Sequence, residues 1–178
     1  MGREMNRRTL LPVLSLTTFM LLLMGCGGDT GSPPTPMPSS KAGYGINIEI
    51  RDIPSRWSLL EPFFPKYVDV FGVNVFTTEE TSNDKVMHAA NVLAQYLDNN
   101  ADGKADNQRV LDELINGNAS LIMAESYDQM ESLMEDFPDE IHELFDNTME
   151  SQELNGDETN PSYRFDASLE EVLHLITQ

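Results

Sequence analysis

The sequence contains a single cysteine, Cys26, among 178 residues. One cysteine cannot form a disulfide within its own chain, so the fold must be held together by packing alone. Because Cys26 lies close to the N-terminus, the rest of the chain has no thiol nucleophile. We therefore expect neither a disulfide framework nor a catalytic cysteine.

Positive charge is scarce. The chain has 11 Lys and Arg residues against 30 Asp and Glu, a formal net charge of −19, and no Lys or Arg occurs from Val110 to Tyr163. Such a surface repels nucleic acid and anionic membranes, and it concentrates cations. This excludes a nucleic-acid partner and leaves two interpretations: the acidic half binds a cation or a basic partner, or it is a solvated face suited to a salty environment. We favour the solvated face, because runs of like charge are usually solvating.

The sequence also lacks a Gly-rich loop after a strand, so it offers no phosphate site. Glycine and proline are instead concentrated in residues 27–43, GGDTGSPPTPMPSSKAG, which have no apolar periodicity. The prolines favour an extended chain, so we interpret this stretch as a tether. Residues 44–178 then form one domain's worth of chain, with enough apolar side chains for a modest core.

The first 25 residues have the pattern of a signal peptide. Three arginines precede an apolar run at residues 10–24, which is short for a membrane-spanning helix. The sequence Leu23-Met24-Gly25-Cys26 then resembles the lipobox of bacterial lipoproteins. The resemblance implies cleavage before Cys26, diacylation of this residue, and a mature protein held to a membrane by lipid chains.

This resemblance divides the chain into a lipoprotein signal peptide at 1–25, the lipidated cysteine and tether at 26–43, and a single acidic domain at 44–178. Gly27 follows the cysteine where lipoproteins kept in the inner membrane often carry Asp, so the resemblance favours the outer membrane. The last predicted helix stops at Gln178 without a capping residue, and a reading frame shortened at its C-terminus is therefore an open alternative.

Alternating or continuous apolar residues predict three strands. Residues 46–51 alternate and indicate an edge strand, whereas residues 67–76 are apolar on both faces and indicate a central strand with Gly72 as a bulge. A short buried strand is expected at residues 119–124. A strand, helices and a further strand together suggest a crossover unit.

Helical spacing is clearest on either side of residue 100. Apolar residues recur at 84–97, with His88 on the opposite, exposed face, and a shorter helix follows Val110. Gly117 can end this second helix by taking a left-handed conformation. A helix, a loop and a helix are therefore expected in succession.

Two further helices are expected around Pro138, with His142 and Glu143 on an exposed face, and a last helix is expected at 165–178. We predict an α/β or α+β domain with a small three-stranded sheet, about five helices and one helix–loop–helix unit of EF-hand type. The methionines at helical spacing are expected in the core.

The loop between the first two helices has the spacing of a metal site. Residues 98–109, DNNADGKADNQR, alternate oxygen-bearing side chains and place Gly103 at the turn. This stretch resembles the calcium loop of EF-hand proteins, in which alternate side chains and one backbone carbonyl surround a hard cation with oxygens. The ligands implied by the resemblance are Asp98, Asn100, Asp102, Lys104 through its carbonyl, and Asp106 directly or through water.

The loop departs from this pattern at its twelfth position, where Arg109 replaces the expected Glu. Two oxygens are lost and a positive charge arrives. Asp112 or Glu113, one helical turn later, could replace the missing glutamate only if the second helix leaves the loop in a different direction from that of an EF-hand. Weak calcium binding is one expectation, and the equal alternative is a polar turn whose Asp and Asn side chains cap backbone groups.

A second pattern lies in the last predicted helix. The sequence Glu170-Glu171-Val172-Leu173-His174 resembles the HExxH motif of zincin metallohydrolases with its first histidine changed to glutamate. The resemblance implies Glu170 and His174 as zinc ligands and Glu171 as the general base. Four residues follow His174, which leaves no stretch for a third ligand, and Ser168 with Glu171 also fits a helix capping box.

The sequence therefore favours a membrane-anchored, extracytoplasmic lipoprotein with a degenerate EF-hand-like loop that binds calcium weakly in a structural or adhesive role. Its alternative is a truncated zincin-like metallohydrolase that lacks its third metal ligand. A binding role is favoured over catalysis, calcium is favoured over zinc, and the membrane is the one partner that the sequence indicates.

Overall fold

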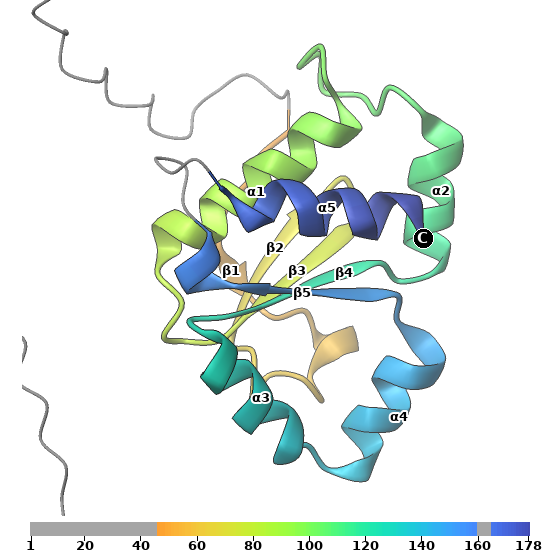
Figure 1. The fold of residues 1–178 in the computed structure, drawn as a ribbon. Coiled ribbons are helices and arrows are strands. Elements are labelled where there is room, and N and C mark those ends of the chain that lie inside the picture. The colour runs from red at the N-terminus through yellow and green to blue at the C-terminus, as the bar shows by residue number, and fades with distance from the viewer. Residues whose placement is uncertain (1–45, 160–164) are drawn as a thin grey trace, which may run out of the picture. The chain divides into compact units, whose positions relative to one another are not determined.

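The computed structural model describes residues 46–159 and 165–178. The predicted signal peptide at 1–25 and the lipidated cysteine and tether at 26–43 all lie outside these residues. Within the described part, five strands form one mixed sheet in the order β1-β2-β3-β4-β5 (Figure 1). Their bounds are Arg51–Asp52 (β1), Lys66–Val70 (β2), Val73–Thr77 (β3), Ser120–Ala124 (β4) and Ser151–Asn155 (β5). The pairs β1–β2 and β2–β3 are antiparallel, whereas β3–β4 and β4–β5 are parallel.

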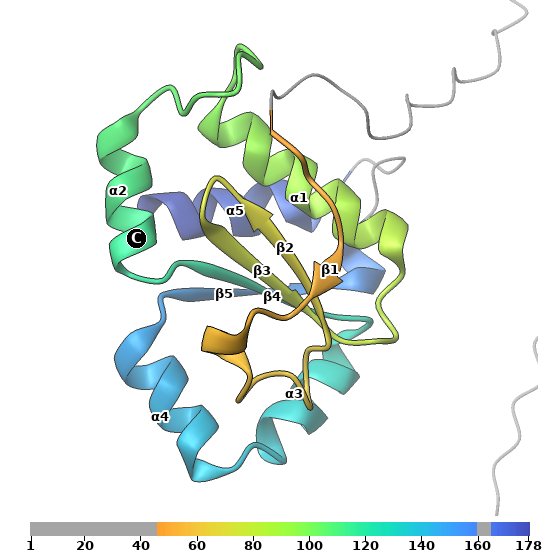
Figure 2. The same cartoon turned by 180° about the vertical axis from the view of Figure 1, so that it is seen from behind.

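Helices cover both faces of this sheet. The α-helices are α1 (Asn83–Leu97), α2 (Gln108–Asn116), α3 (Tyr127–Glu135), α4 (Asp139–Thr148) and α5 (Ala167–Thr177). One buried cluster joins α1, α2 and α5 to one face, and a second joins α3, α4 and the segment around Trp57 to the other (Figures 1 and 2). Along β4, Leu121 and Met123 belong to the first cluster and Ile122 and Ala124 to the second. The mixed α/β class is confirmed, and the sheet is larger than predicted.

The main reason for the larger sheet is a hairpin within the predicted central strand. Residues 67–76 form most of β2 and β3, which are joined by Phe71 and Gly72 with φ of 57° and 95°. Positive φ at both central residues is the signature of the tight turn that matches strand twist, and Asn or Gly usually occupies the first of them. Asp69 supports the turn by accepting a hydrogen bond from the Gly72 N–H at 3.1 Å. The predicted bulge at Gly72 was wrong, because an aromatic residue such as Phe71 rarely adopts the left-handed conformation that the turn requires.

The two outer strands also differ from expectation. In the predicted strand at 46–51 only Arg51, with Asp52 after it, pairs with β2, although Ile46, Ile48 and Ile50 do turn towards the core. β5 was not predicted, because its sequence SQELN contains few residues typical of strands and buries only Leu154. Its pairing with the fully buried β4 compensates for this weak local preference.

The helices occur where the sequence places them, with one difference at a terminus. α2 ends at Asn116, its C-cap residue Gly117 has φ of −79°, and the left-handed residue is instead Asn118 with φ of 49°. Gly117 instead leaves room for a neighbour: a Cβ atom at this position would lie 2.6 Å from the carboxylate carbon of the flexible Glu150 side chain. None of the helices in the described ranges has the length and apolar content needed to span a bilayer.

Candidate functional site

The predicted calcium loop joins α1 to α2. Asp98 follows the last residue of α1 and is completely buried, and its backbone N–H donates to the carbonyl of Ala94 at 2.8 Å. At the other end, the Asn107 side chain accepts from the N–H of Val110 at 3.4 Å and caps α2. The exiting helix therefore begins at Gln108, which places Arg109 in its first turn.

The Asp98 carboxylate folds back over the loop. Its Oδ1 accepts from the Asp102 N–H at 3.1 Å and its Oδ2 from the Gly103 N–H at 2.7 Å. Asn100 Oδ1 also accepts from the Asp102 N–H, at 2.9 Å, and Asp102 Oδ1 accepts from the Lys104 N–H at 3.0 Å. Successive side-chain oxygens thus point inwards and satisfy the backbone donors of a tight turn.

Asp106 closes the loop onto its own beginning. Its N–H donates to the Leu97 carbonyl at 2.8 Å, and its Oδ2 accepts from the Asn99 N–H at 2.9 Å. Its Oδ1 accepts from Asn100 Nδ2 at 3.3 Å. The structure therefore brings Asp98, Asn100, Asp102 and Asp106 together in one hydrogen-bonded turn.

Two residues of the loop have left-handed backbone conformations. Gly103 has φ of 84°, which agrees with its predicted place at the sharp turn, and Ala101 has φ of 58°. A left-handed conformation costs a residue with a Cβ atom about 1–2 kcal/mol. Hydrogen bonding throughout the loop therefore holds Ala101 in a conformation that its own backbone disfavours.

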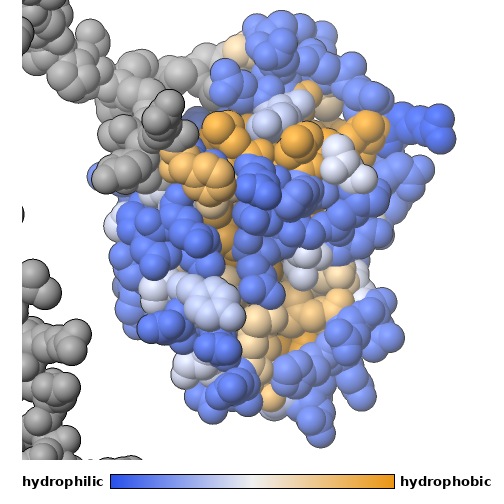
Figure 3. Space-filling model, viewed as in Figure 1, coloured by the Kyte–Doolittle hydropathy of each residue, from blue (hydrophilic) through white to orange (hydrophobic). Residues whose placement is uncertain are grey.

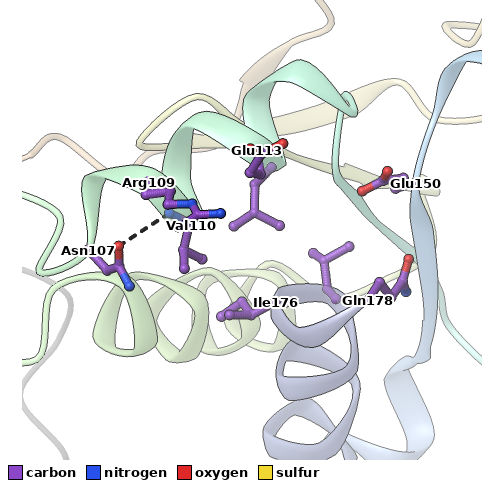
Figure 4. Close-up of a pocket in the computed structure, with 9 residues that line it drawn as sticks. Asn107, Arg109, Val110, Glu113, Glu150, Ile176 and Gln178 are labelled. Carbon is purple, nitrogen blue, oxygen red and sulfur yellow. Dashed lines mark hydrogen bonds between the residues drawn. The ribbon is translucent and has the colours of Figure 1, made fainter.

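The residues considered as replacements for the missing twelfth ligand have other surroundings. Asp112 Oδ1 accepts from Gln108 Nε2 at 2.7 Å on the exposed side of α2. Glu113 and Arg109 instead line a cavity of about 350 Å³ between α2 and α5, together with Ile176 (Figure 4). Nothing in this geometry supports Asp112 or Glu113 as a substitute for the glutamate that Arg109 replaces.

Within the described residues, no group of three or more His, Cys, Asp or Glu side chains is arranged to hold a metal ion. The loop oxygens have a different set of partners, namely the backbone N–H groups of the turn. The alternative prediction, a polar turn whose Asp and Asn side chains cap backbone groups, accounts for the hydrogen bonds of the loop. They also leave acceptor capacity, because a carboxylate has about four lone-pair sites and Asp98 uses two of them.

The residues of the zincin-like motif lie on α5. Glu170 and His174 are exposed, and His174 Nδ1 is 3.4 Å from Glu171 Oε2. The histidine thus interacts with the residue predicted as general base. The buried face of α5 consists of Ala167, Ser168, Val172 and Leu175, so the motif points largely away from the core.

Asp166, rather than Ser168, caps α5. Asp166 Oδ1 accepts from the Ser168 N–H at 3.2 Å and from its hydroxyl at 2.6 Å. Its Oδ2 lies 2.6 Å from His88 Nε2, so His88 is a half-buried partner of α5 and not the exposed histidine predicted. Burial would raise the pKa of Asp166, but the Ser168 hydrogen bonds and His88 outweigh burial and hold the pKa below its ordinary value.

A polar network that the sequence does not reveal lies at the carboxyl ends of β3 and β4. Gln129 Oε1 accepts from Thr78 Oγ1 at 3.2 Å and from the Glu125 N–H at 2.8 Å, while its Nε2 donates to Glu80 at 2.8 Å. Lys85 Nζ lies 3.2 Å from Glu125 Oε1. These residues are far apart in the sequence, so only the parallel pairing of β3 and β4 could have predicted their meeting.

No protein-family model, curated protein or solved structure matches the chain.

Proposed function

We propose that this protein is a lipid-anchored, extracytoplasmic protein whose acidic domain binds calcium weakly through residues 98–106, in a structural or adhesive role. The observation that carries the proposal is the loop's inward set of oxygens, which begins with the buried carboxylate of Asp98. Asn100, Asp102 and Asp106 present further side-chain oxygens in the same turn. Hard oxygen donors at this spacing suit calcium.

The affinity is expected to be low for two reasons. The carboxylates already accept backbone hydrogen bonds, and a cation must share those oxygens. In addition, Arg109 supplies no oxygen where a bidentate carboxylate would complete the site, and its charge opposes a cation. Affinities of extracellular calcium modules extend to dissociation constants of about 10⁻⁴–10⁻³ M, and we place this loop at that weak end.

A structural role follows from the position of the loop. α1 is packed against β2 and α5, and α2 packs against β3, so the loop connects two helices that the sheet fixes separately. A cation bound to Asp98 and Asp106 would hold the two ends of this connection together. The expected result is a more rigid α1–α2 junction without a large change in the fold.

Calorimetric titration of the full chain with calcium tests the proposal. We expect saturable heat for the native chain and its loss in Asp98→Ala and Asp102→Ala. Asp112→Asn is the matched control, because it removes a carboxylate charge from α2 outside the proposed ligand set. The absence of binding heat for the native chain up to millimolar calcium would refute calcium binding.

Arg109 permits a complementary experiment in the opposite direction. Arg109→Glu restores the twelfth ligand, and Arg109→Gln removes the charge without supplying a carboxylate. If the loop has EF-hand geometry, the Glu variant should bind calcium about tenfold or more tightly than the Gln variant. Equal affinities of the two variants would assign Arg109 a purely electrostatic role.

The lipid anchor has its own test. We expect mass spectrometry of the membrane fraction to detect a diacylated N-terminal Cys26, and we expect Cys26→Ser to release the protein from membranes. Fractionation of the native protein between inner and outer membranes tests the preference for the outer membrane. An unmodified Cys26 in a retained N-terminal segment would refute lipid anchoring.

The zincin-like alternative is supported only by the proximity of Glu171 to His174. Equilibrium dialysis against zinc should detect uptake that disappears in the double variant Glu170→Ala and His174→Ala. Uptake that survives this double substitution would exclude Glu170 and His174 as the ligands.

A further inference from the structure

A groove lies between α3, α4 and β5, on the face of the sheet opposite α5. It consists of two adjoining hollows of about 310 and 210 Å³, which share Met130, Met134 and Glu153. In Figure 3, apolar surface emerges below α5 between hydrophilic flanks. The groove is remote in sequence from the calcium loop, and it does not depend on calcium binding.

The interior of the groove is apolar and aromatic. Ile122 and Met130 form buried parts of its wall, and Phe137 is also buried there. The Phe145 ring stacks on Phe137 with their centroids 5.7 Å apart, and the His142 ring meets Phe137 edge-on at 5.9 Å. Such a surface suits an apolar, preferably planar, ligand body.

Methionine makes the groove adaptable. Met134 is 38% exposed, which contradicts the expectation that the methionines at helical spacing all lie in the core. Met130 lines the same groove and is buried. Methionine side chains are unbranched and polarizable, so they can adjust to ligands of different shape.

The rim of the groove is acidic. Asp146 lines it from α4 and Glu153 from β5, while Glu131 and Glu135 line the adjoining hollow from α3. No Lys or Arg occurs in the sequence from Val110 to Tyr163, which includes all these elements. A positively charged group at the rim therefore meets carboxylates without competition from basic lining residues.

The surroundings of Glu153 give independent support for a cation. Burial raises the pKa of Glu153, and the negative charge of Glu171 raises it further. The ionised carboxylate is thus disfavoured in the unliganded groove, and a ligand cation beside it would offset the repulsion from Glu171. Aromatic rings within the same groove add a favourable cation–π surface.

We infer that this groove binds small organic cations, namely an ammonium group attached to an aromatic or branched aliphatic body. The apolar interior would hold the body and the Asp146–Glu153 rim would hold the ammonium group. Anions are excluded by the rim charge. The combined size of the hollows is that of a small-molecule site.

Calorimetry of the full chain at pH 7 with three probes of matched shape tests the inference. We expect 2-phenylethylammonium to bind with a dissociation constant of about 1 mM, and we expect 2-phenylethanol to bind about tenfold more weakly. Phenylacetate should not bind. Equal binding of the three probes, or no saturable binding of the ammonium at about 10 mM, would overturn the proposal.

Substitutions locate the site. The double variant Asp146→Asn and Glu153→Gln should weaken 2-phenylethylammonium binding about tenfold. The double variant Glu143→Gln and Asp157→Asn is the control, because it removes the same two charges from exposed positions outside the groove. All four side chains are accessible to solvent and Glu153 is only partly buried, so thermal unfolding should change little. Equal weakening by the control would show general charge attraction and refute a specific site.

Discussion

His88 Nε2 and Asp166 Oδ2 lie 2.6 Å apart, which joins the middle of α1 to the residue that caps α5. Their side chains are only 18% and 10% exposed, so the pair lies at the packed junction of the two helices. Asp166 also holds the first turn of α5 through Ser168. One carboxylate thus fixes both the beginning of α5 and its attachment to α1.

We predict that Asp166→Asn lowers the free energy of unfolding at pH 7 by about 1–3 kcal/mol, because a charged cap and its bond to His88 are lost. The pKa of Asp166 is lower in the folded than in the unfolded chain, so its stabilisation is present above the ordinary carboxyl pKa and declines as pH falls through the folded pKa. The difference between native and variant should therefore shrink below about pH 4.

Urea denaturation at a series of pH values measures this effect. Asp157→Asn, at an exposed residue, is the control and should change stability little. A constant difference between native chain and Asp166→Asn from pH 7 to pH 3 would contradict the assigned role of the Asp166 charge.

Exchanging alanine and glycine at positions 101 and 103 should change the stability of the protein in opposite directions. Both have positive φ, so Gly103→Ala should destabilise the protein by about 1–2 kcal/mol, and Ala101→Gly should stabilise it by up to about 1 kcal/mol. Thermal unfolding of the two variants in the presence of a chelator measures the difference without calcium. Two changes of the same sign would show that loop strain does not control stability here.

Gly156 should tolerate a methyl group less well than Gly117, although the nearest atom is closer at Gly117. A Cβ at position 117 would meet the end of the flexible Glu150 side chain at 2.6 Å, whereas at 156 it would meet the backbone oxygen of Glu125 at 2.9 Å. We expect Gly156→Ala to cost about 1–3 kcal/mol and Gly117→Ala less than about 1 kcal/mol.

Chemical denaturation of both glycine variants checks this order. Adding Glu150→Ala to Gly117→Ala should remove most of the remaining cost at position 117, because the colliding side chain is then absent. A larger cost for Gly117→Ala than for Gly156→Ala would show that Glu150 cannot move aside.

Tyr67 should titrate later than an ordinary tyrosine. Burial raises its pKa to about 12, with a further contribution from the charge of Asp69. Its hydroxyl lies 3.0 Å from Asn74 Oδ1 and 3.2 Å from Asp69 Oδ2, and it can donate to one of them at a time. Ultraviolet titration of tyrosinate in the native chain and in Tyr67→Phe should identify one late-ionising tyrosine.

The stability of the native chain should fall as pH rises from about 10 to 12, because the unfolded chain loses the Tyr67 proton before the folded chain does. Tyr67→Phe should lack this contribution to alkaline unfolding, and it should cost about 1–2 kcal/mol at pH 7 through the lost hydrogen bond. Identical alkaline unfolding of the two chains would contradict the raised pKa.

Much of the fold could be predicted from periodicity. The buried faces of α1 and α2 and the fully buried β4 follow directly from the spacing of apolar residues. The hairpin was missed because Phe71 adopts a left-handed conformation that is rare for an aromatic residue. β5 was missed because pairing with β4, and not local preference, makes SQELN a strand.

The candidate sites were predictable to different extents. The oxygens of Asp98, Asn100, Asp102 and Asp106 lie within nine residues, so sequence spacing was enough to bring them together. His88 and Asp166 are 78 residues apart, and only the packing of α5 on α1 unites them. The groove was hidden for the same reason, since α3, α4 and β5 each contribute part of its lining.

Glu153 gives β5 a further property. β5 is the last strand in the sheet order, and the outer side of such a strand offers backbone groups that can pair with another chain. A negative charge on this edge strand opposes pairing with a second copy of the protein. Because the pKa of Glu153 is raised, this charge is neutralised at a higher pH than that of an ordinary glutamate. We therefore expect mild acid to weaken this protection of the β5 edge before it neutralises an ordinary glutamate.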